Sequence, residues 1–524
     1  MLFWVMSDRG IPRSYRMMQG FGVNTFALIN GRGERTFCKF IWTPELGVHS
    51  LVWDEALKLA GQDPDFHRKD LYEAIDHKAY PKWKFGVQLI PERDQDRFDF
   101  DILDATKIWP EDLVPIRYVG ELELNRNVDE FFTETEQVAF CTSHLVPGID
   151  FSNDPLLQGR NFSYFDTQIS RLGINWEELP INRPVCPVLN FNRDGQGRHT
   201  ITKGKVNYWP NRFGVNAPTA EKQAGFESFP VQEEGIRLRK LAPKWKDTLS
   251  QAQLFYNSMS KVEKAHIMRA FSFELDHCDE PVVYERLVDR LTEIDLSLAQ
   301  AVAEKVGAPT PTDQTKPNPR RTVKGLSQHE YMPVEPTIKS RRIAILIADG
   351  YDAGSYEAMK AAILAHNALP FTIAPKRQRV KASNGTSSTQ PDHFLNGQRG
   401  TMFDAIYVPG GADSVKTLVG IGLARFWVRE TFAHLKTIGA SGEGIKLVDV
   451  ALKEAQGLKL ATSGSDVIEW YGVVTAHTPD TSSIKGMVKI VKEAHDFVGS
   501  LFYQISRHRN WARELDGLAD QVTV

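Results

Sequence analysis

A proline-rich segment divides this chain into two regions of different character. Residues 306–340 contain six prolines among polar and basic neighbours: Pro309, Pro311, Pro317, Pro319, Pro333 and Pro336. Proline lacks the backbone N–H that a helix interior or a central strand needs, so this segment predicts a linker. The chain has 524 residues, which is more than one hydrophobic core organises. We therefore expect separate domains before and after the linker.

The first 240 residues alternate short apolar strands with turns. Residues 25–29 and 35–42 flank the sequence Asn-Gly-Arg-Gly, which is typical of a hairpin turn. Alternating apolar residues predict further strands at 83–90 and 117–124, and short helices are expected at 55–60 and 69–75. Antiparallel strands spaced in this way are typical of a barrel.

Two further regions have their own patterns. Residues 248–305 carry apolar residues at helical spacing and predict an all-helical segment. After the linker, 343–347 and 405–408 have the composition of buried strands, and 458–462 is a third candidate. Helical patterns lie between these strands, so 341–524 predicts an α/β unit with a parallel sheet covered on both faces.

The composition excludes several classes of protein. The net charge is -3 with acids and bases interleaved, so there is no electrostatic case for nucleic acid or an anionic membrane as a partner. No apolar run approaches the ~20 residues that cross a bilayer. The four cysteines lack metal-ligand spacing and are expected to be free, buried thiols: Cys38, Cys141, Cys186 and Cys278.

The stretch 160–168 carries the strongest chemical signal. It follows Gly159, which is expected to end one segment and open a helix. On a helix, Arg160, Tyr164 and Gln168 share one column, and Arg171 lies a further near-turn along. A guanidinium beside a phenol favours the phenolate, which is a ligand for ferric iron. The alternative for Tyr164 is a packed helix tyrosine that bonds locally.

Several motifs in the same order resemble the monofunctional haem catalases. They are the haem-ligand stretch 160–168 and the segments 7–16, 21–26, 107–110, 124–127 and 207–211. The long region that follows is similar to that of the large-subunit branch of this family. The resemblance implies hydrogen peroxide as substrate, water and oxygen as products, and haem (b or d) with its iron as cofactor.

The resemblance also implies a fold and a domain division. The expected fold is an α+β catalase β-barrel core (incomplete) with a wrapping arm and a helical domain, followed by an α/β flavodoxin-like domain. The corresponding ranges are 1–173 for the partial barrel ending in the haem helix, 174–247 for the arm, 248–305 for the helices, 306–340 for the linker and 341–524 for the last domain. A homotetramer is implied as well.

The last domain resembles a class I glutamine amidotransferase-like domain. Active members of that superfamily use a cysteine at a sharp strand-to-helix turn, and the matching turn here is 440–444. It carries no cysteine, and neither does any other position in 341–524, so cysteine-based amide chemistry is excluded. Ser441 is a weak substitute. Residues 409–411 are expected to form either an anion-binding loop or, in preference, a plain strand-end turn.

The resemblance assigns roles to named residues around the haem. Tyr164 is the proximal iron ligand and Arg160 holds it as a phenolate. Arg171 pairs with a haem propionate and Gln168 supports the site, while Val23 forms part of the pocket wall. In some large-subunit catalases the residue at the place of Cys141 is joined to the proximal tyrosine, so a Cys141–Tyr164 cross-link is a hypothesis.

The distal half of the site is the open question. The family uses a distal histidine and asparagine from a segment that precedes the matching start of this chain. The four histidines before Tyr164 lie in other contexts and are not expected to serve: His49, His67, His77 and His144. A truncated gene model is the preferred explanation; the alternative is a true truncation, which would make the chain a catalytically impaired haem-binding or structural relative. Localisation stays undetermined, with the cytoplasm preferred and secretion open if a segment is missing.

Overall fold

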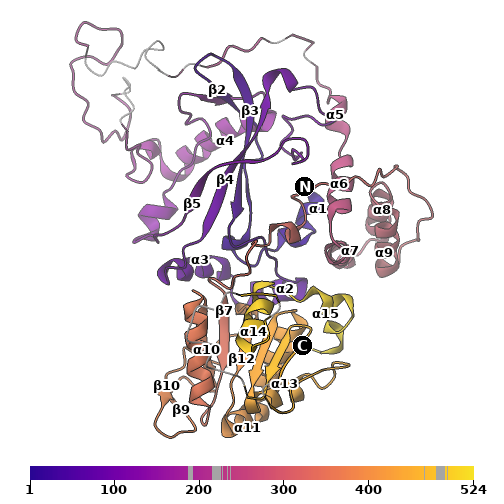
Figure 1. Ribbon diagram of the computed structural model, residues 1–524. Helices are drawn as coiled ribbons and strands as arrows, with labels where there is room; N and C mark the ends of the chain where they lie inside the picture. The colour runs from indigo at the N-terminus through magenta and orange to yellow at the C-terminus, as the bar shows by residue number, and fades with distance from the viewer. Residues whose placement is uncertain are drawn as a thin grey trace.

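The structure is a computed structural model that describes residues 1–186, 193–214, 226, 228–232, 234–236, 238–464, 466–478, 490–492 and 494–524. Parts of the predicted arm 174–247 lie outside these residues. A curled sheet from the first part of the chain lies above a second sheet from the last part, with a group of helices to one side (Figure 1). In the described part of the chain, no helix is both long and apolar enough to cross a membrane.

The N-terminal sheet is antiparallel and confirms the predicted hairpin. Strand β2 (Phe26–Ile29) pairs with β3 (Arg35–Pro44), and β3 pairs in turn with β4 (Lys82–Pro91). The sheet continues through β5 (Arg117–Glu123) on one side and β6 (Ile149–Phe151) on the other, while β1 (Gly20–Phe21) also joins β3. The predicted helices are present as α2 (Trp53–Gln62) and α3 (Phe66–Asp76).

The predicted all-helical segment is confirmed. It contains α6 (Ser250–Ser258), α7 (Lys261–Asp276), α8 (Pro281–Thr292) and α9 (Leu296–Val306), after the short α5 (Pro243–Lys246). Helix α7 begins with a capping box in which Ser260 and Glu263 satisfy each other's backbone N–H groups. The apolar faces of these helices form one core together with Phe3.

The proline-rich segment is irregular, as predicted, but it packs against the rest of the molecule. Its one regular element is the 3₁₀ turn Gln328–Tyr331. Val323 and Leu326 are buried in the helical core. Glu263 accepts hydrogen bonds from the Ser327 hydroxyl (2.8 Å) and the Gln328 backbone N–H (2.9 Å). The segment is therefore a fixed connection and not a free tether.

The C-terminal unit has the predicted parallel sheet. The strand order is β11-β8-β7-β12-β13-β15-β14, and only β14 runs antiparallel to its neighbour. The strands are β7 (Arg342–Leu346), β8 (Leu369–Ala374), β11 (His393–Phe394), β12 (Ala405–Val408), β13 (Thr437–Ser441), β14 (Val467–Trp470) and β15 (Val473–Ala476). A separate two-stranded ribbon joins β9 (Val380–Lys381) to β10 (Ser388–Thr389).

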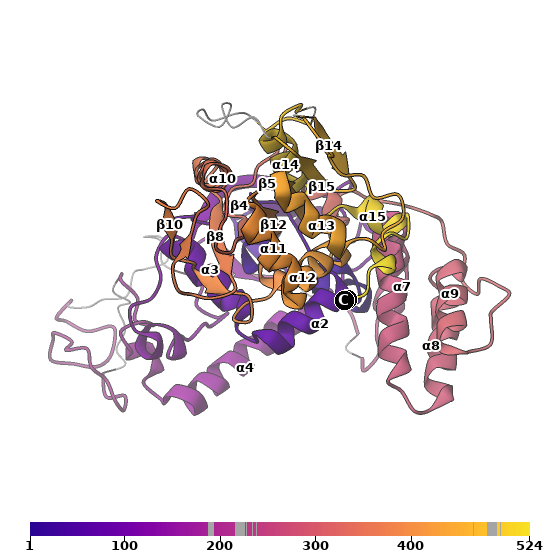
Figure 2. The same cartoon turned by 90° about the horizontal axis from the view of Figure 1, so that it is seen from below.

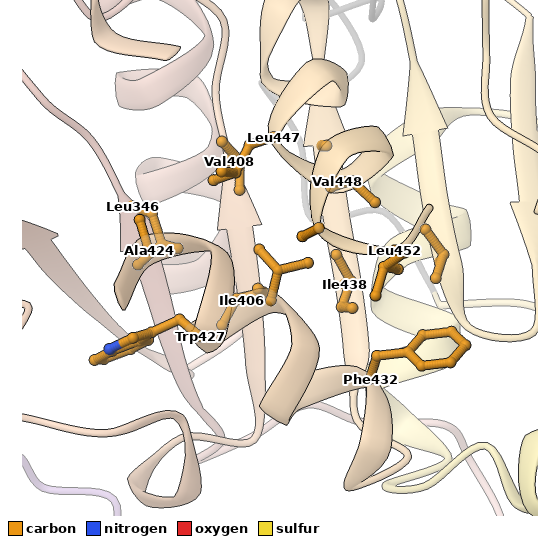
Figure 3. Packing of buried hydrophobic residues seen from close by; sticks show 14 of the residues in the cluster. Leu346, Ile406, Val408, Ala424, Trp427, Phe432, Ile438, Leu447, Val448 and Leu452 are labelled. Atoms are coloured by element: carbon orange, nitrogen blue, oxygen red, sulfur yellow. The ribbon is translucent and has the colours of Figure 1, made fainter. Parts of the chain in front are cut away.

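Helices cover both faces of this sheet, also as predicted. One face packs against α10 (Ala353–Ala365) and α14 (Phe497–Ser506). The other packs against α11 (Ala412–Gly420), α12 (Gly422–Ala433) and α13 (Ile445–Ala451) (Figure 2). Figure 3 shows the second core, in which Trp427 and Phe432 of α12 lie against Ile406 and Ile438 of the sheet. Because both faces are covered, the strand residues are apolar throughout.

One predicted strand of this sheet is wrong. Residues 458–462 form no strand, because Ala461 donates its N–H to the Thr475 hydroxyl (2.9 Å) and not to a strand backbone. The neighbour of β12 is instead β13, whose small residues gave little strand signal. Gly439 of β13 is small for a reason: a Cβ there would lie 2.8 Å from the Leu501 side chain of α14.

A buried ionic contact, which we call the seam, joins the N-terminal region to the C-terminal unit. It comprises Arg13, Glu55, Asp404, Lys436 and Arg509, all buried. Arg13 pairs with Asp404 at 2.8 Å, and Glu55 pairs with Lys436 at 2.6 Å and with Arg509 at 2.5 Å. Buried pairs of this kind fix the arrangement of the two regions relative to each other, because breaking any pair leaves a buried charge without a partner.

We predict that Glu55→Gln destabilises the protein by about 3–5 kcal/mol, since two buried cations lose their partner. Burial alone would raise the pKa of Glu55, but Arg509 and Lys436 lower it to about 2. Its stabilising charge is therefore fully present above the ordinary value of 4.5 and is lost as the pH falls through about 2.

Denaturant unfolding at neutral and acid pH tests this, with Glu285→Gln on exposed α8 as the matched control. Equal stability of Glu55→Gln and the control at neutral pH would contradict the assignment.

Candidate functional site

Helix α4 (Pro155–Leu172) carries the predicted site and starts earlier than expected. Asp154 is its N-cap and accepts hydrogen bonds from the N–H groups of Leu156 (2.9 Å) and Leu157 (3.0 Å). Pro155 occupies the first helical position, where its missing N–H costs nothing. The prediction that Gly159 opens the helix is wrong: Gly159 lies inside α4, with open space where a Cβ would be.

The predicted column on α4 brings Arg160 and Tyr164 together. Arg160 donates from Nη2 to the Tyr164 hydroxyl oxygen at 3.1 Å. The Arg160 guanidinium carbon also lies 5.1 Å from the centre of the tyrosine ring. A guanidinium only donates, so the Tyr164 oxygen is the acceptor in this contact.

Two residues behind this pair were missed by the sequence analysis. Asn24 accepts a hydrogen bond from Arg160 Nη1 through its Oδ1. Its Nδ2 donates to Asp154 Oδ2 at 2.9 Å. Asn24 and Asp154 are both buried. The result is a continuous line of hydrogen bonds from Asp154 through Asn24 and Arg160 to Tyr164, in which each side chain orients the next.

Gln168 and Arg171 hold a neighbouring segment against α4. Gln168 is buried; its Nε2 donates to the Phe140 carbonyl (3.1 Å) and its Oε1 accepts from Arg171 (2.8 Å). Arg171 is exposed and donates to the carbonyls of Glu136 and Val138, both at 2.6 Å. The structure thus gives Arg171 a second task, which is to fasten residues 136–140 onto the helix.

Cys141 belongs to the segment that crosses the Tyr164 face of α4. Its neighbours on both sides bond to that face: Phe140 to Gln168, and Thr142 to Asn161 at 2.6 Å. Asn161, Tyr164 and Gln168 are spaced i, i+3 and i+7 and therefore share a helix face. All four cysteines are free thiols, but burial is confirmed for Cys38 alone: Cys141 and Cys278 are partly exposed and Cys186 is exposed. The Cys141 sulfur lies 2.8 Å from the Ser143 hydroxyl oxygen.

Exposed apolar side chains occur on α4 and on the two segments that bond to it. Leu156 lies two turns before Tyr164 on α4 and is 51% exposed, and Phe140 is 77% exposed. Val23, next to Asn24, is 43% exposed and borders a cavity of about 250 Å³ together with Phe40 and Ile41. A flat apolar group is the kind of ligand whose binding would remove this surface from water.

The four upstream histidines have partners away from the Arg160–Tyr164 column. His49 Nε2 bonds the Leu46 carbonyl (3.0 Å), and His77 Nδ1 bonds that of Glu73 (2.7 Å). His144 pairs with Glu177 at 2.9 Å, and His67 stacks edge-on against Tyr15. That none of these histidines serves as a distal base stays a prediction.

In the C-terminal unit, the turn 440–444 and the loop 409–411 make hydrogen bonds to other residues of the chain. As predicted, β13 ends in a sharp strand-to-helix turn, with Gly442 at φ 56°. Ser441 is buried and its hydroxyl lies 2.7 Å from that of Tyr407. Glu443 accepts the Gly411 N–H at 2.8 Å, which gives that donor an internal partner. This geometry supports the plain turn over the anion-binding loop.

Three family models match the chain. The model described as catalase matches residues 1–215, the one described as catalase-related immune-responsive matches 242–306, and the one described as the C-terminal domain found in long catalases matches 339–498. These matches define a long, multidomain haem enzyme with iron as its redox metal. The chain belongs to the catalase family.

Curated relatives agree with these matches. Catalase A of Emericella nidulans is 63% identical over 529 residues, which cover 100% of this chain and 71% of that protein. Catalase-1 of Neurospora crassa is 62% identical, with 100% and 70% covered, and Catalase HPII of Pseudomonas putida is 46% identical, with 91% and 68% covered. The function of this chain is the decomposition of hydrogen peroxide.

We predict that Arg160→Lys weakens haem retention by about 10–100-fold, because a lysine cannot bond Asn24 and Tyr164 with one planar fork. The measurement is the rate of haem transfer to excess apomyoglobin, followed by absorbance. Arg183→Lys, on an exposed side chain outside this hydrogen-bonded line, is the control. Equal haem transfer rates for the two variants would show that the hydrogen bonds of Arg160 do not contribute to haem retention.

Proposed function

We propose that Tyr164 is the proximal ligand of the haem with which this chain decomposes hydrogen peroxide to water and oxygen. The observation that carries the proposal is the bond from Arg160 to the Tyr164 oxygen, backed by Asn24 and Asp154. A phenolate is an anionic oxygen donor, and tyrosine is the proximal haem ligand that catalases use. The buried carboxylate of Asp154 stabilises Arg160 through Asn24, and Arg160 stabilises the phenolate.

The residues present fit a haem. Leu156, Phe140 and Val23 offer exposed apolar surface next to the Tyr164 column. Arg171 remains a candidate for a propionate, because a guanidinium has five N–H donors and three of its bonds are to Glu136, Val138 and Gln168. When bound, the iron supplies the electron transfer that peroxide disproportionation requires. Haem b and haem d both satisfy this description, and their absorbance spectra distinguish them.

We further propose a covalent bond between Cys141 and Tyr164. Support comes from the bonds of Phe140 and Thr142, which bring the cysteine's backbone across the tyrosine face of α4. The sulfur would join a carbon of Tyr164, with one hydrogen leaving each residue. Hydrogen peroxide accepts both hydrogens and becomes two waters, so the substrate itself balances the oxidation.

The domain division 1–173, 174–247, 248–305, 306–340 and 341–524 is retained as part of the proposal. The parallel sheet with helices on both faces supports the flavodoxin-like, amidotransferase-like assignment of the last part. The arm assignment and the homotetramer are supported by apolar side chains that are almost fully exposed between 185 and 236: Val185, Ile201 and Ile236. Such residues require a protein surface to cover them.

A second candidate function is a haem-binding relative with little turnover. The observation that favours it is that the four upstream histidines contact other groups: His49 the Leu46 carbonyl, His77 the Glu73 carbonyl, His144 Glu177 and His67 Tyr15. Oxygen release from peroxide by the haem-loaded chain separates the two. Rapid release supports the catalase, and haem binding without release supports the relative.

We predict that Tyr164→Phe abolishes tight haem retention, since phenylalanine has no oxygen to donate to iron; the loss should exceed about 100-fold. The ratio of haem absorbance to protein absorbance and the iron content are measured after gel filtration. Tyr72→Phe, on exposed α3, should keep wild-type haem content. Unchanged haem in Tyr164→Phe would overturn the ligand assignment.

We predict that peroxide-treated, haem-loaded protein yields one joined peptide containing Cys141 and Tyr164, lighter by two hydrogens than its separate parts. Peptide mass spectrometry after proteolysis under reducing conditions measures this directly. Cys141→Ser should give two separate peptides while keeping haem. Two unmodified peptides from active, haem-loaded wild type would refute the cross-link but leave the role of Tyr164 intact.

A further inference from the structure

Two buried histidine rings meet inside the seam. His49 lies in the loop between β3 and α2, and His508 follows α14 at the other end of the chain. Their ring centres are 4.6 Å apart, and the side chains are 3% and 4% exposed. The contact therefore joins the N-terminal region to the C-terminal unit through two groups that can change charge near neutral pH.

The hydrogen bonds of His508 allow only the neutral ring. Its Nδ1 lies 3.0 Å from Arg341 Nη1, and a guanidinium can only donate, so Nδ1 must be the acceptor. Its Nε2 lies 2.9 Å from the Ser50 carbonyl and must donate to it. A proton on Nδ1 would set two N–H groups against each other and break the bond to Arg341.

The charges around the two rings leave no partner for an added proton. Arg341 and Arg509 of the C-terminal unit act on both rings, and Asp404 is the carboxylate that acts on His49. The nearby carboxylates are already paired, Asp404 with Arg13 and Glu55 with both Arg509 and Lys436. A positive charge added to either ring would meet the guanidiniums of Arg341 and Arg509.

Both rings resist protonation in the closed seam. Burial, and then the charge of Arg341, lowers the pKa of His49 well below its ordinary value of 6.5. Burial, and then Arg509 and His49, does the same for the pKa of His508. In an opened seam the rings would regain the ordinary value, so the open state binds more protons below about pH 6.5. Closure is therefore favoured above that pH and weakened below it.

We propose that the His49–His508 contact makes the seam acid-sensitive, so that protonation of these rings separates the C-terminal unit from the N-terminal region. Protonation of His508 removes the acceptor of Arg341, while its Nε2 keeps the hydrogen that it donates to the Ser50 carbonyl. The buried ion pairs of Glu55 and Asp404 stay ionised in this range, so the histidines set the pH at which the contact loosens. The device lies apart from Tyr164 and does not depend on the haem assignment.

Hydrogen exchange read by mass spectrometry on the full chain tests the proposal. Peptides covering 46–52 and 505–511 are followed from about pH 7.5 to about pH 5, after correction for the intrinsic pH dependence of exchange. We expect the protection of both peptides to fall together by about tenfold or more, while helix α7 keeps its protection. Protection that stays constant over this range would overturn the proposal.

Substitution identifies the responsible groups. His508→Gln keeps an acceptor and a donor but cannot gain a proton, so the loss of protection should move to lower pH by about half a unit or more. His49→Gln is the second variant if the first does not fold. His277→Gln, at the exposed end of α7, is the control and should behave as wild type. Wild-type midpoints in the folded seam variants would exclude the histidines as the trigger.

Discussion

The carboxylate of Asp154 is the interaction on which the rest of the haem face depends. It caps α4 through Leu156 and Leu157, and it also accepts from the Thr25 N–H (3.2 Å) and from Asn24. One buried charge therefore fixes where the helix starts and how it sits on the N-terminal sheet. The positions of Arg160 and Tyr164 therefore depend on the contacts of Asp154. Because four donors surround the carboxylate, its burial costs little, and moving it would leave several of them without a partner.

The seam also relies on buried carboxylates, which here fix the C-terminal unit relative to the N-terminal region. Two units with separate cores could rotate against each other if only apolar surface joined them. Glu55 instead receives two cations from the C-terminal unit, and Asp404 receives Arg13 from the N-terminal region. The Arg342 backbone N–H (2.8 Å), from its own unit, also bonds to Asp404. Buried pairs contribute little net stability compared with an apolar contact, but they penalise every other arrangement.

The sequence predicted those features that depend on the spacing of residues close together in the chain. The hairpin of β2 and β3 follows from its glycine-containing turn, and the Arg160–Tyr164 column follows from the helical period. Asn24 and Asp154 were missed because they lie 130 residues apart, and no local rule pairs them. The wrong strand at 458–462 and the missed β13 have one cause: an apolar run was preferred over a small-residue strand whose Gly439 is required by the approach of α14.

The proline-rich segment shows how composition and context combine. Prolines deny residues 306–340 a regular hydrogen-bond pattern, so any buried donors there need side-chain acceptors. Glu263 supplies them for Ser327 and Gln328 while it also caps α7, and Arg16 donates to the Ser340 hydroxyl at 2.7 Å. The linker thus ends against the same N-terminal region that the seam holds. Two separate contacts therefore hold the C-terminal unit against the N-terminal region: the packed linker and the ion pairs of the seam. If one of them loosens, the other still limits how far the unit can move.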